Sequence, residues 1–232
     1  EILRCLVGSE MCIRDRYSNS DGQINVLLDT ADSLFEGAAL IGTAGGEINF
    51  TMSDLSLWRM LGDSSVTALA VSSGAIVDMT QYDDYQQLEI SELSGSGGEF
   101  IMKTDLASET DGDKLYVTDA AAGTSQFVQV NDVSIINGAV VTGDKKLLLI
   151  TDASKNVEFI GKNLNNGGLW DITPTLENGL AVGGSEEEWY LTKLRKEANN
   201  DTSVLLGAAD NAYAMWRNTN CLLYTSPSPR DI

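Results

Sequence analysis

Several carboxylates lie close together in the middle of the chain, and paired carboxylates are the groups that glycoside hydrolysis requires. They are Asp83, Asp84, Glu89 and Glu92. In such a pair, one carboxyl group protonates the leaving oxygen and the other attacks the sugar or activates water. The chain carries 34 acidic residues against 15 basic ones, however, so acidic neighbours are expected by chance. Because nothing marks one pair above the others, we predict no catalytic residue.

Two further segments have the composition of ligand-binding loops. Asp111–Asp113 (Asp-Gly-Asp) is similar to a fragment of a calcium loop, but it lacks the spacing of oxygen ligands in an EF-hand. We interpret it as a solvated turn. Gly95–Gly98 carries three glycines, but no Lys-Ser or Lys-Thr pair follows it, as a phosphate-binding loop requires. The sequence therefore predicts neither a metal site nor a cofactor.

Tryptophans and a run of glutamates each allow more than one interpretation. Trp58, Trp170 and Trp189 form either a platform on which sugars stack or part of the packed core, and we favour core or coil-capping packing. Glu186–Glu188 is either a solvated charge run or a guard against aggregation through strand edges. Neither feature by itself identifies a ligand.

The residue types that the chain lacks narrow the chemistry further. It has no histidine, and its three cysteines, Cys5, Cys12 and Cys221, all lie near the ends. A Ser-His-Asp triad and a zinc site of the Cys/His type are therefore excluded. The net charge of −19 argues against nucleic acid or an anionic membrane as a partner, because binding phosphates requires a basic surface.

The two ends of the chain share one DNA sequence read on opposite strands. Cys221–Asp231 (CLLYTSPSPRD) can be written with codons whose reverse complement, in a shifted frame, encodes Leu6–Asp15 (LVGSEMCIRD). We therefore interpret residues 1–16 and 221–232 as translated sequencing adapter and expect them to be poorly ordered or to pack without specificity. The natural termini, with any signal sequence or membrane domain, would then lie beyond the two junctions.

Short apolar runs separated by Gly, Asp, Asn and Ser make up most of the chain. Several alternate apolar and polar side chains with a period of two, which is typical of half-buried strands. An all-β fold follows, either a sandwich or a parallel β-helix in which each coil stacks on its neighbours. The expected strands are Gln23–Leu28, Glu47–Met52, Val66–Val71, Gly74–Met79, Gln87–Leu93, Glu99–Lys103, Lys114–Thr118, Gln126–Val130, Lys146–Thr151 and Val157–Ile160.

An ordered series of motifs runs from Asn49 to Trp216. A Trp-x-Met precedes an apolar strand, and a glycine-rich turn then enters a Phe-x-Met strand, followed by Asp-x-Leu-x-Val and a further alternating strand. In this series the chain resembles the C-terminal passenger region of classical, pertactin-like bacterial autotransporters. The matching residues are Trp58, Met60, Leu93, Gly95, Gly97, Gly98, Phe100, Met102, Asp113, Leu115, Val117, Gly123, Phe127 and Val130, with Trp189 in a closing strand.

The resemblance implies a right-handed parallel β-helix, a single-stranded solenoid, that ends in an autochaperone segment and a short C-terminal α-helix. We place passenger coils at residues 17–93, the autochaperone-like end at 94–198, and the start of a linker helix to a missing outer-membrane β-barrel at 199–220. The expected autochaperone core consists of Trp58, Leu93, Gly95, Gly97, Gly98, Phe100, Met102, Leu115, Val117, Phe127 and Trp189.

The residues themselves also make predictions within this fold. Apolar residues of Asp201–Trp216 fall on one helical face, with Asp201, Thr202 or Ser203 as the N-cap, and this helix is either the linker or a cap on the open end of the β-helix. Parallel stacking from Tyr17 to about Lys196 requires inward side chains to align in ladders. The expected inward residues are Leu88, Ile90, Phe100, Met102, Leu115, Val117, Leu147 and Leu149.

By resemblance, the chain is a membrane-proximal stem that helps a surface virulence or adhesion protein to fold and leave the cell. Its partners would be its own outer-membrane β-barrel translocator, the machinery that assembles the barrel, and a host-surface or polysaccharide ligand, with no nucleic acid. It would pass through the periplasm to the outer membrane and cell surface, or be secreted. Two alternatives stay open: a carbohydrate-active β-helix enzyme that uses paired carboxylates, and a direct adhesin.

Overall fold

The computed structural model describes residues 2–4, 16–18, 22–42, 45–136, 145–164 and 170–225. The chain divides into two compact units. Residues 1–164 and 173–195 form the larger unit, and residues 165–172 and 196–232 form the smaller one. The larger unit is built almost entirely from strands, whereas the smaller one is dominated by a single helix.

The strands of the N-terminal coils follow one another at short intervals, as the glycine-punctuated sequence predicts. They are β1 (Ile2–Arg4), β2 (Arg16–Ser18), β3 (Gln23–Leu28), β4 (Leu34–Glu36), β5 (Ala39–Ile41), β6 (Glu47–Met52), β7 (Leu57–Arg59), β8 (Ser64–Val71) and β9 (Ile76–Asp78).

The later elements include three helices. They are β10 (Gln87–Ser94), β11 (Ser96–Thr104), β12 (Lys114–Ala120), β13 (Thr124–Asp132), α1 (Val133–Ile136), β14 (Leu147–Asp152), β15 (Val157–Gly161), β16 (Trp170–Asn178), α2 (Gly179–Val182), β17 (Glu188–Ala198) and α3 (Asn200–Thr225).

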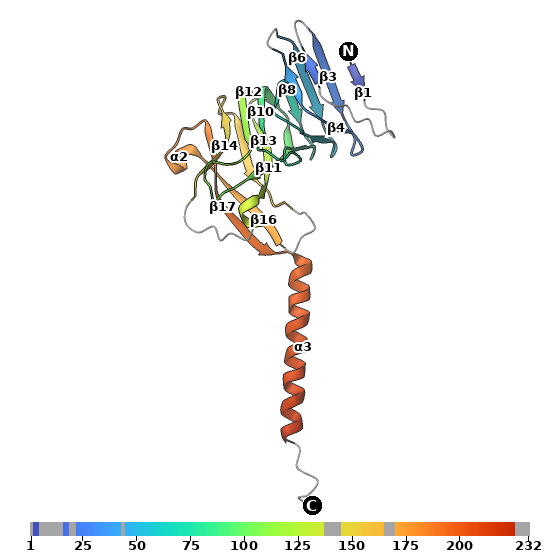
Figure 1. The fold of residues 1–232 in the computed structure, drawn as a ribbon, viewed down its shortest axis with the longest axis vertical. Helices are drawn as coiled ribbons and strands as arrows, with labels where there is room; N and C mark the ends of the chain where they lie inside the picture. The colour runs from blue at the N-terminus through green and yellow to red at the C-terminus, as the bar shows by residue number, and fades with distance from the viewer. Residues whose placement is uncertain are drawn as a thin grey trace, which may run out of the picture. The chain divides into compact units, whose positions relative to one another are not determined.

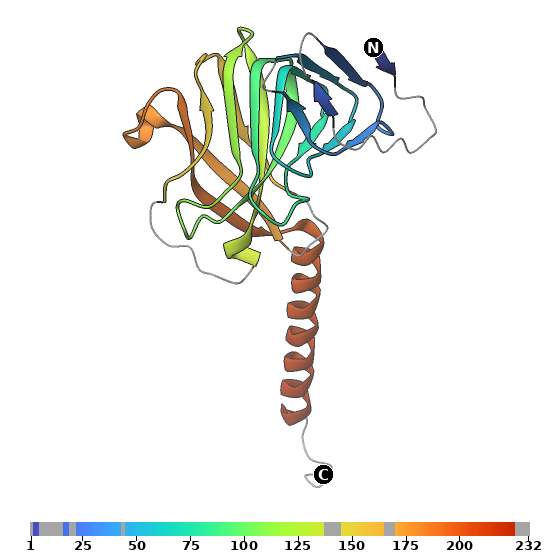
Figure 2. The same ribbon diagram turned by 45° about the horizontal axis from the view of Figure 1, so that its top comes forward.

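Strands from successive turns of the chain pair side by side in parallel (Figure 1). One sheet has nine strands in the order β1-β3-β6-β8-β10-β12-β14-β17-β16, and a second has six in the order β15-β13-β11-β9-β7-β4. Strands β2 and β5 form a small third sheet. Figure 2 shows the strands of the larger unit standing side by side along the stack. The predicted all-β fold, a parallel β-helix, is confirmed.

The interior is a set of apolar ladders. Leu88 of β10 lies opposite Leu115 of β12, and Ile90 lies opposite Val117. Phe100 of β11 lies between Val77 and Val128 of its two neighbouring strands. All the predicted inward residues are at most 2% exposed, so that prediction is confirmed. Burying each such side chain contributes about 1.5–3 kcal/mol.

The parallel stack ends earlier than predicted. Strand β17 pairs antiparallel with β14, with Leu147 opposite Leu191 and Leu148 opposite Tyr190. The expectation of parallel coils up to Lys196 is therefore wrong. The last two strands form a hairpin and not a further coil, because the sheet neighbours β16 and β17 are joined only through α2 and a short turn, in which Gly183 adopts a left-handed φ of 80°. A parallel pair would need a long crossover at this connection.

Part of each presumed adapter segment is structured. Strand β1 pairs in parallel with β3, and β2, which begins at Arg16, pairs with β5. Residues 5–15 and 226–232, on which the expectation of non-specific packing also falls, lie outside the described residues. Helix α3 continues past residue 220 to Thr225. Pairing along a sheet edge uses backbone groups, so β1 needs no evolved sequence to occupy its place.

The smaller unit contains the predicted C-terminal helix, α3. Its N-terminus is capped by Asn199, whose side-chain Oδ1 accepts a hydrogen bond from the backbone nitrogen of Thr202 at 2.8 Å. The expected caps Asp201, Thr202 and Ser203 are therefore wrong, because the helix begins at Asn200, before them. In the part of the chain that the structure describes, no helix is both long and apolar enough to span a membrane.

Candidate functional site

A glycine corner joins three successive coils at the start of the autochaperone-like segment. Gly95 adopts a φ of 87°, and a Cβ atom there would lie 2.4 Å from the carbonyl oxygen of Val71. At Gly98, a Cβ would lie 2.2 Å from the Val71 side chain. Gly97 also has a left-handed φ, of 79°. Only glycine allows the backbone of this coil to approach its neighbour so closely.

The side chain of Gln126 fills the space that these glycines leave. Its Nε2 donates to the carbonyl oxygens of Val71 at 3.2 Å and Gly95 at 3.0 Å. Its Oε1 accepts from the backbone nitrogen of Gly98 at 2.8 Å. Because Gln126 is fully buried, these bonds form where water does not compete for the same groups. One carboxamide therefore fixes the register of three coils.

Buried carboxylates lie at the next corners, where Asp132 bonds to the preceding coil and Asp152 bonds within its own turn. Asp132 Oδ2 accepts from the Thr104 hydroxyl at 2.8 Å and from the backbone nitrogen of Leu106 at 2.9 Å. Asp152 accepts from the backbone nitrogens of Ser154 and Val157, both at 3.1 Å. Neither aspartate is exposed. Multiple donors on each carboxylate offset the cost of removing it from water.

Asp113 is a third buried carboxyl group at these corners. Its Oδ1 accepts from the backbone nitrogen of Gln86 at 2.8 Å, and its Oδ2 accepts from that of Lys103. Burial raises the pKa of Asp113 to about 6, although the two backbone donors act in the opposite direction. The interpretation of Asp111–Asp113 as a solvated turn is therefore wrong for Asp113, which is fully buried. Among the described residues, no acidic cluster could hold a metal ion.

Most of the predicted core residues meet inside this segment. Leu93, Phe100, Met102, Leu115 and Val117 are all buried in one continuous cluster. Trp189 is partly buried and packs against that cluster, with its ring 5.7 Å from Phe159 in an edge-to-face arrangement.

Trp58 belongs to a different part of the stack. Its ring lies parallel to that of Phe50 at 4.5 Å, and its Nε1 donates to the carbonyl oxygen of Gly37 at 3.0 Å. Because Trp58 is fully buried, a sugar-stacking platform that includes it is wrong. The side chain of Trp170, the other proposed member, lies outside the described residues.

Phe127 is not a core residue, contrary to the prediction. Its neighbours Gln126 and Val128 are the inward, buried residues of β13, so Phe127 faces outward. The ammonium of Lys162 lies 5.3 Å from the centre of its ring and also pairs with Glu99. A cation over an aromatic face is favourable, which explains why this aromatic side chain faces outward.

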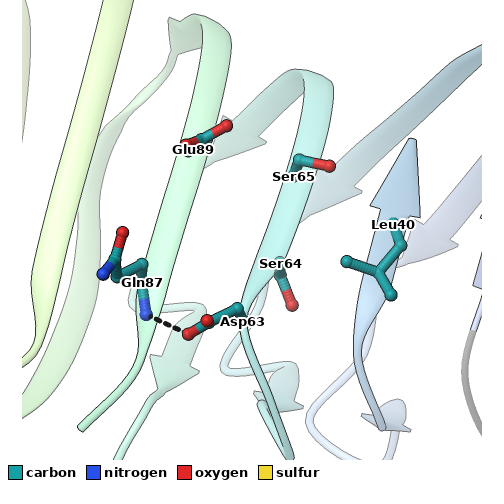
Figure 3. A pocket seen from close by; sticks show the side chains of 6 residues that line it. All are labelled: Leu40, Asp63, Ser64, Ser65, Gln87 and Glu89. Atoms are coloured by element: carbon teal, nitrogen blue, oxygen red, sulfur yellow. Dashed lines mark hydrogen bonds between the residues drawn. The ribbon is translucent and has the colours of Figure 1, made fainter. Parts of the chain in front are cut away.

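The four carboxylates considered for catalysis are all exposed. Glu89 lines an open hollow of about 180 Å³ on the outer face of β5, β8 and β10 (Figure 3). There the Asp63 carboxylate accepts a hydrogen bond from the backbone nitrogen of Gln87 at 2.8 Å. The remaining lining residues are Leu40, Ser64 and Ser65. The hollow offers hydrogen-bonding groups but no buried carboxylate pair.

The glutamate run is engaged with a cation. Lys155 Nζ lies 3.4 Å from Glu186 and 3.5 Å from Glu187, and Glu188 accepts from the Tyr190 hydroxyl at 3.0 Å. The glutamates lie at the start of the closing strand β17, and Lys155 lies in the turn between β14 and β15. The run is thus a set of surface ion pairs, each contributing up to about 1 kcal/mol.

The fold and the glycine corner place this chain among the parallel β-helix proteins, whose coils stack into a solenoid. The pertactin family model matches residues 66–193, which is more than half of the chain. The chain therefore belongs to the pertactin family. Passengers of this kind are exported across the outer membrane to the cell surface or secreted, and this localisation applies to the chain.

Two curated relatives are autotransporters. Over 174 residues the chain is 29% identical to the autotransporter adhesin/invasin TibA of Escherichia coli O78:H11, covering 70% of this chain and 16% of TibA. Over 174 residues it is 30% identical to the autotransporter CRAC of Citrobacter rodentium, covering 68% of this chain and 10% of CRAC. The chain thus spans less than a fifth of either relative.

Gln126 and Asp132 are the residues of this site that the sequence did not reveal. Polar side chains in an alternating strand usually face solvent, and Gln126 was placed only within an expected strand. The position of Gln126 in the alternating pattern was the available signal. Gln126, Val128 and Val130 are spaced two residues apart, so they share the inward face of β13. A polar residue in phase with buried apolar ones indicates a satisfied internal hydrogen bond.

Proposed function

We propose that this chain is the membrane-proximal β-helical stem of an autotransporter passenger and that residues 94–198 act as its autochaperone. The observation that carries the proposal is the set of buried polar side chains in this segment that bond across coils, namely Gln126, Asp113 and Asp132. Such links specify one register of stacking. A segment that folds to one register can serve as the surface on which the remaining coils are added.

The closing strand and the helix support the same role. Strand β17 ends the nine-stranded sheet by pairing antiparallel with β14, and α3 follows two residues later. In the proposed function, α3 begins the linker to an outer-membrane β-barrel, the translocator. That barrel and its assembly machinery are the partners that this proposal requires.

Adhesion is a second role for the complete passenger. It is supported by the name of one relative, TibA, which is an adhesin/invasin. We infer no catalytic activity for this segment, because the carboxylates proposed for glycoside hydrolysis are exposed and lack the paired, partly desolvated arrangement that raises the pKa of a general acid.

Native-state hydrogen exchange tests the autochaperone role. We expect amides of β11, β12 and β13 to exchange only through global unfolding, and those of β3, β6 and β8 to exchange through partial unfolding of the N-terminal coils. Mass spectrometry of peptides from the two groups of strands would measure this difference. Stronger protection of β3, β6 and β8 would contradict the proposal.

A further inference from the structure

Basic side chains gather at the closing end of the larger unit, although the chain as a whole carries a net charge of −19. Three lysines face one pocket of about 270 Å³ between the start of β14, the end of α2 and strands β16 and β17. The pocket is lined by Lys145, Lys146, Glu177, Ala181, Val182, Thr192 and Lys193. Three lysines thus face one carboxylate, that of Glu177, among the lining residues.

The antiparallel closing strand brings two of these lysines to the same pocket. Leu147, the first residue of β14, lies opposite Leu191. Lys145 precedes that pair by two residues and Lys193 follows it by two, and both line the pocket. An anion held there would be attracted by both ammonium groups.

The present partners of Lys145 and Lys146 leave hydrogen-bonding capacity for a ligand. Lys145 Nζ lies 3.3 Å from Glu109 Oε2 in a partly exposed ion pair, and such pairs are weak enough to be exchanged for another anion. Lys146 Nζ donates to the carbonyl oxygen of Val182 at the end of α2. Each ammonium carries three N–H donors, so one bond does not saturate it.

We propose that this pocket binds a phosphate-bearing group. A phosphate monoester carries close to two negative charges and several acceptor oxygens, which match converging ammonium donors. The volume lies just below the usual range for small-molecule pockets, about 300–1,000 Å³, and suits a phosphate with one small substituent. The net charge of −19 argues against nucleic acid or an anionic membrane as a partner of the whole surface, and the pocket is a local exception.

Two kinds of ligand contain such a phosphate group: a free phosphate compound and a phosphorylated lipid headgroup. The lipid source rests on the proposed function, which places the closing end of the stem beside the outer membrane. The free source does not depend on that proposal. Binding to the pocket is therefore tested separately from the position of the stem.

The experiment uses the full chain, with inorganic phosphate in calorimetric titration and vesicles in co-sedimentation. The vesicles contain phosphatidylcholine either alone or mixed in equal parts with phosphatidic acid, whose headgroup is a phosphate monoester. The variant carries Lys145→Gln and Lys193→Gln, and its matched control is Lys155→Gln. Lys155 is also a partly exposed lysine paired with glutamates, but it lies outside the pocket.

We expect the chain to bind inorganic phosphate and the double variant to bind it at least about tenfold more weakly, because each lost charge-assisted bond weakens binding substantially. Lys155→Gln should leave the affinity unchanged. If the chain also binds vesicles with phosphatidic acid, but not vesicles of phosphatidylcholine alone, the ligand is a lipid headgroup. If it binds inorganic phosphate but neither kind of vesicle, the ligand is a free phosphate compound. Failure to bind phosphate at millimolar concentration, or equal loss in Lys155→Gln, would overturn the proposal.

Discussion

The N-terminal and C-terminal coils of this β-helix are stabilised by different means. In the N-terminal coils, Phe35, Phe50 and Trp58 pack ring against ring, and the buried Asp78 bonds only within its own turn, to Thr80 and Gln81.

In the C-terminal coils, aliphatic ladders alternate with buried polar side chains, and three of these, Gln126, Asp113 and Asp132, accept or donate across coils. The N-terminal coils have such bonds from Trp58 and Gln86, but none from a buried carboxylate among the described residues.

The difference bears on how each half selects its register. Aromatic and aliphatic packing is non-directional, so a shifted coil still buries much of its apolar surface. A buried carboxylate or carboxamide that loses its donors costs about 1–3 kcal/mol for each unpaired group. The C-terminal coils therefore penalise wrong registers more strongly. This comparison leads to the following predictions, from the largest expected effect to the smallest.

Replacing Phe100 by Ala should lower the free energy of unfolding by about 3–5 kcal/mol, because this ring is fully buried. The matched control is Phe35→Ala, which removes an equally buried ring from the N-terminal coils. We expect Phe100→Ala to slow folding and Phe35→Ala mainly to speed unfolding. Stopped-flow folding and unfolding rates distinguish the two. The reverse pattern would show that the N-terminal coils fold first.

The stability of the C-terminal coils should depend on the ionisation of Asp113. Its pKa is raised from 3.8 to about 6 by burial, so the folded state holds this proton more tightly than the unfolded state. The stabilisation is complete below pH 3.8 and is lost as the pH rises through about 6, a change of about 3 kcal/mol.

Urea unfolding between pH 4 and 7 would measure this effect, with Asp113→Asn as the control that cannot titrate. We expect the free energy of unfolding of the wild type to fall relative to that of Asp113→Asn across this range. Parallel pH profiles for the two proteins would show that Asp113 does not carry the dependence.

Gly95→Ala should lower the free energy of unfolding by about 1–3 kcal/mol, because strain from the left-handed φ adds to the contact with Val71. Gly123→Ala separates the two causes, since Gly123 has a φ of 80° but no atom within 4 Å of the added Cβ. Its cost should be about 1 kcal/mol. Thermal melts of both variants would measure the difference, and equal costs would remove close coil approach as the reason for glycine at 95.

Deleting residues 1–16 together with residues 221–232 should change the free energy of unfolding by less than about 0.5 kcal/mol, the range typical of surface changes. This small change is expected because β1 is a short strand at the sheet edge and contributes little to the free energy of unfolding. Calorimetry of the trimmed and full chains tests this. A drop of several degrees in Tm would mean that an end segment belongs to the evolved fold.

The sequence predicted those parts of the fold that depend on local pattern. Strands β3 and β6 were predicted to the residue, and the inward ladders through Leu88, Leu115, Ile90 and Val117 follow from a period of two. The antiparallel β17 was not predicted, because strand direction is decided by pairing between distant segments. Nothing within Glu188–Ala198 itself differs from a parallel strand.

The candidate site was predicted less completely, and the errors share a cause. Phe127 was assigned to the core because it is aromatic, and Asp113 to a solvated turn because it is charged. Each assignment used the average behaviour of a residue type, whereas here Lys162 stabilises an outward ring and two backbone donors hold an inward carboxylate. Such neighbours, distant in the sequence, become visible only once the coils are stacked.

The antiparallel strand β17 gives the nine-stranded sheet a direction of growth. At its side of the stack, β14 has no free edge for a further parallel coil, whereas β3 lies at the opposite side with only the three residues of β1 beside it. On that side the sheet continues through the antiparallel β17 to β16 and not through a further parallel coil. In the proposed autochaperone role, the remaining coils would therefore add in one order, from the C-terminus towards the N-terminus.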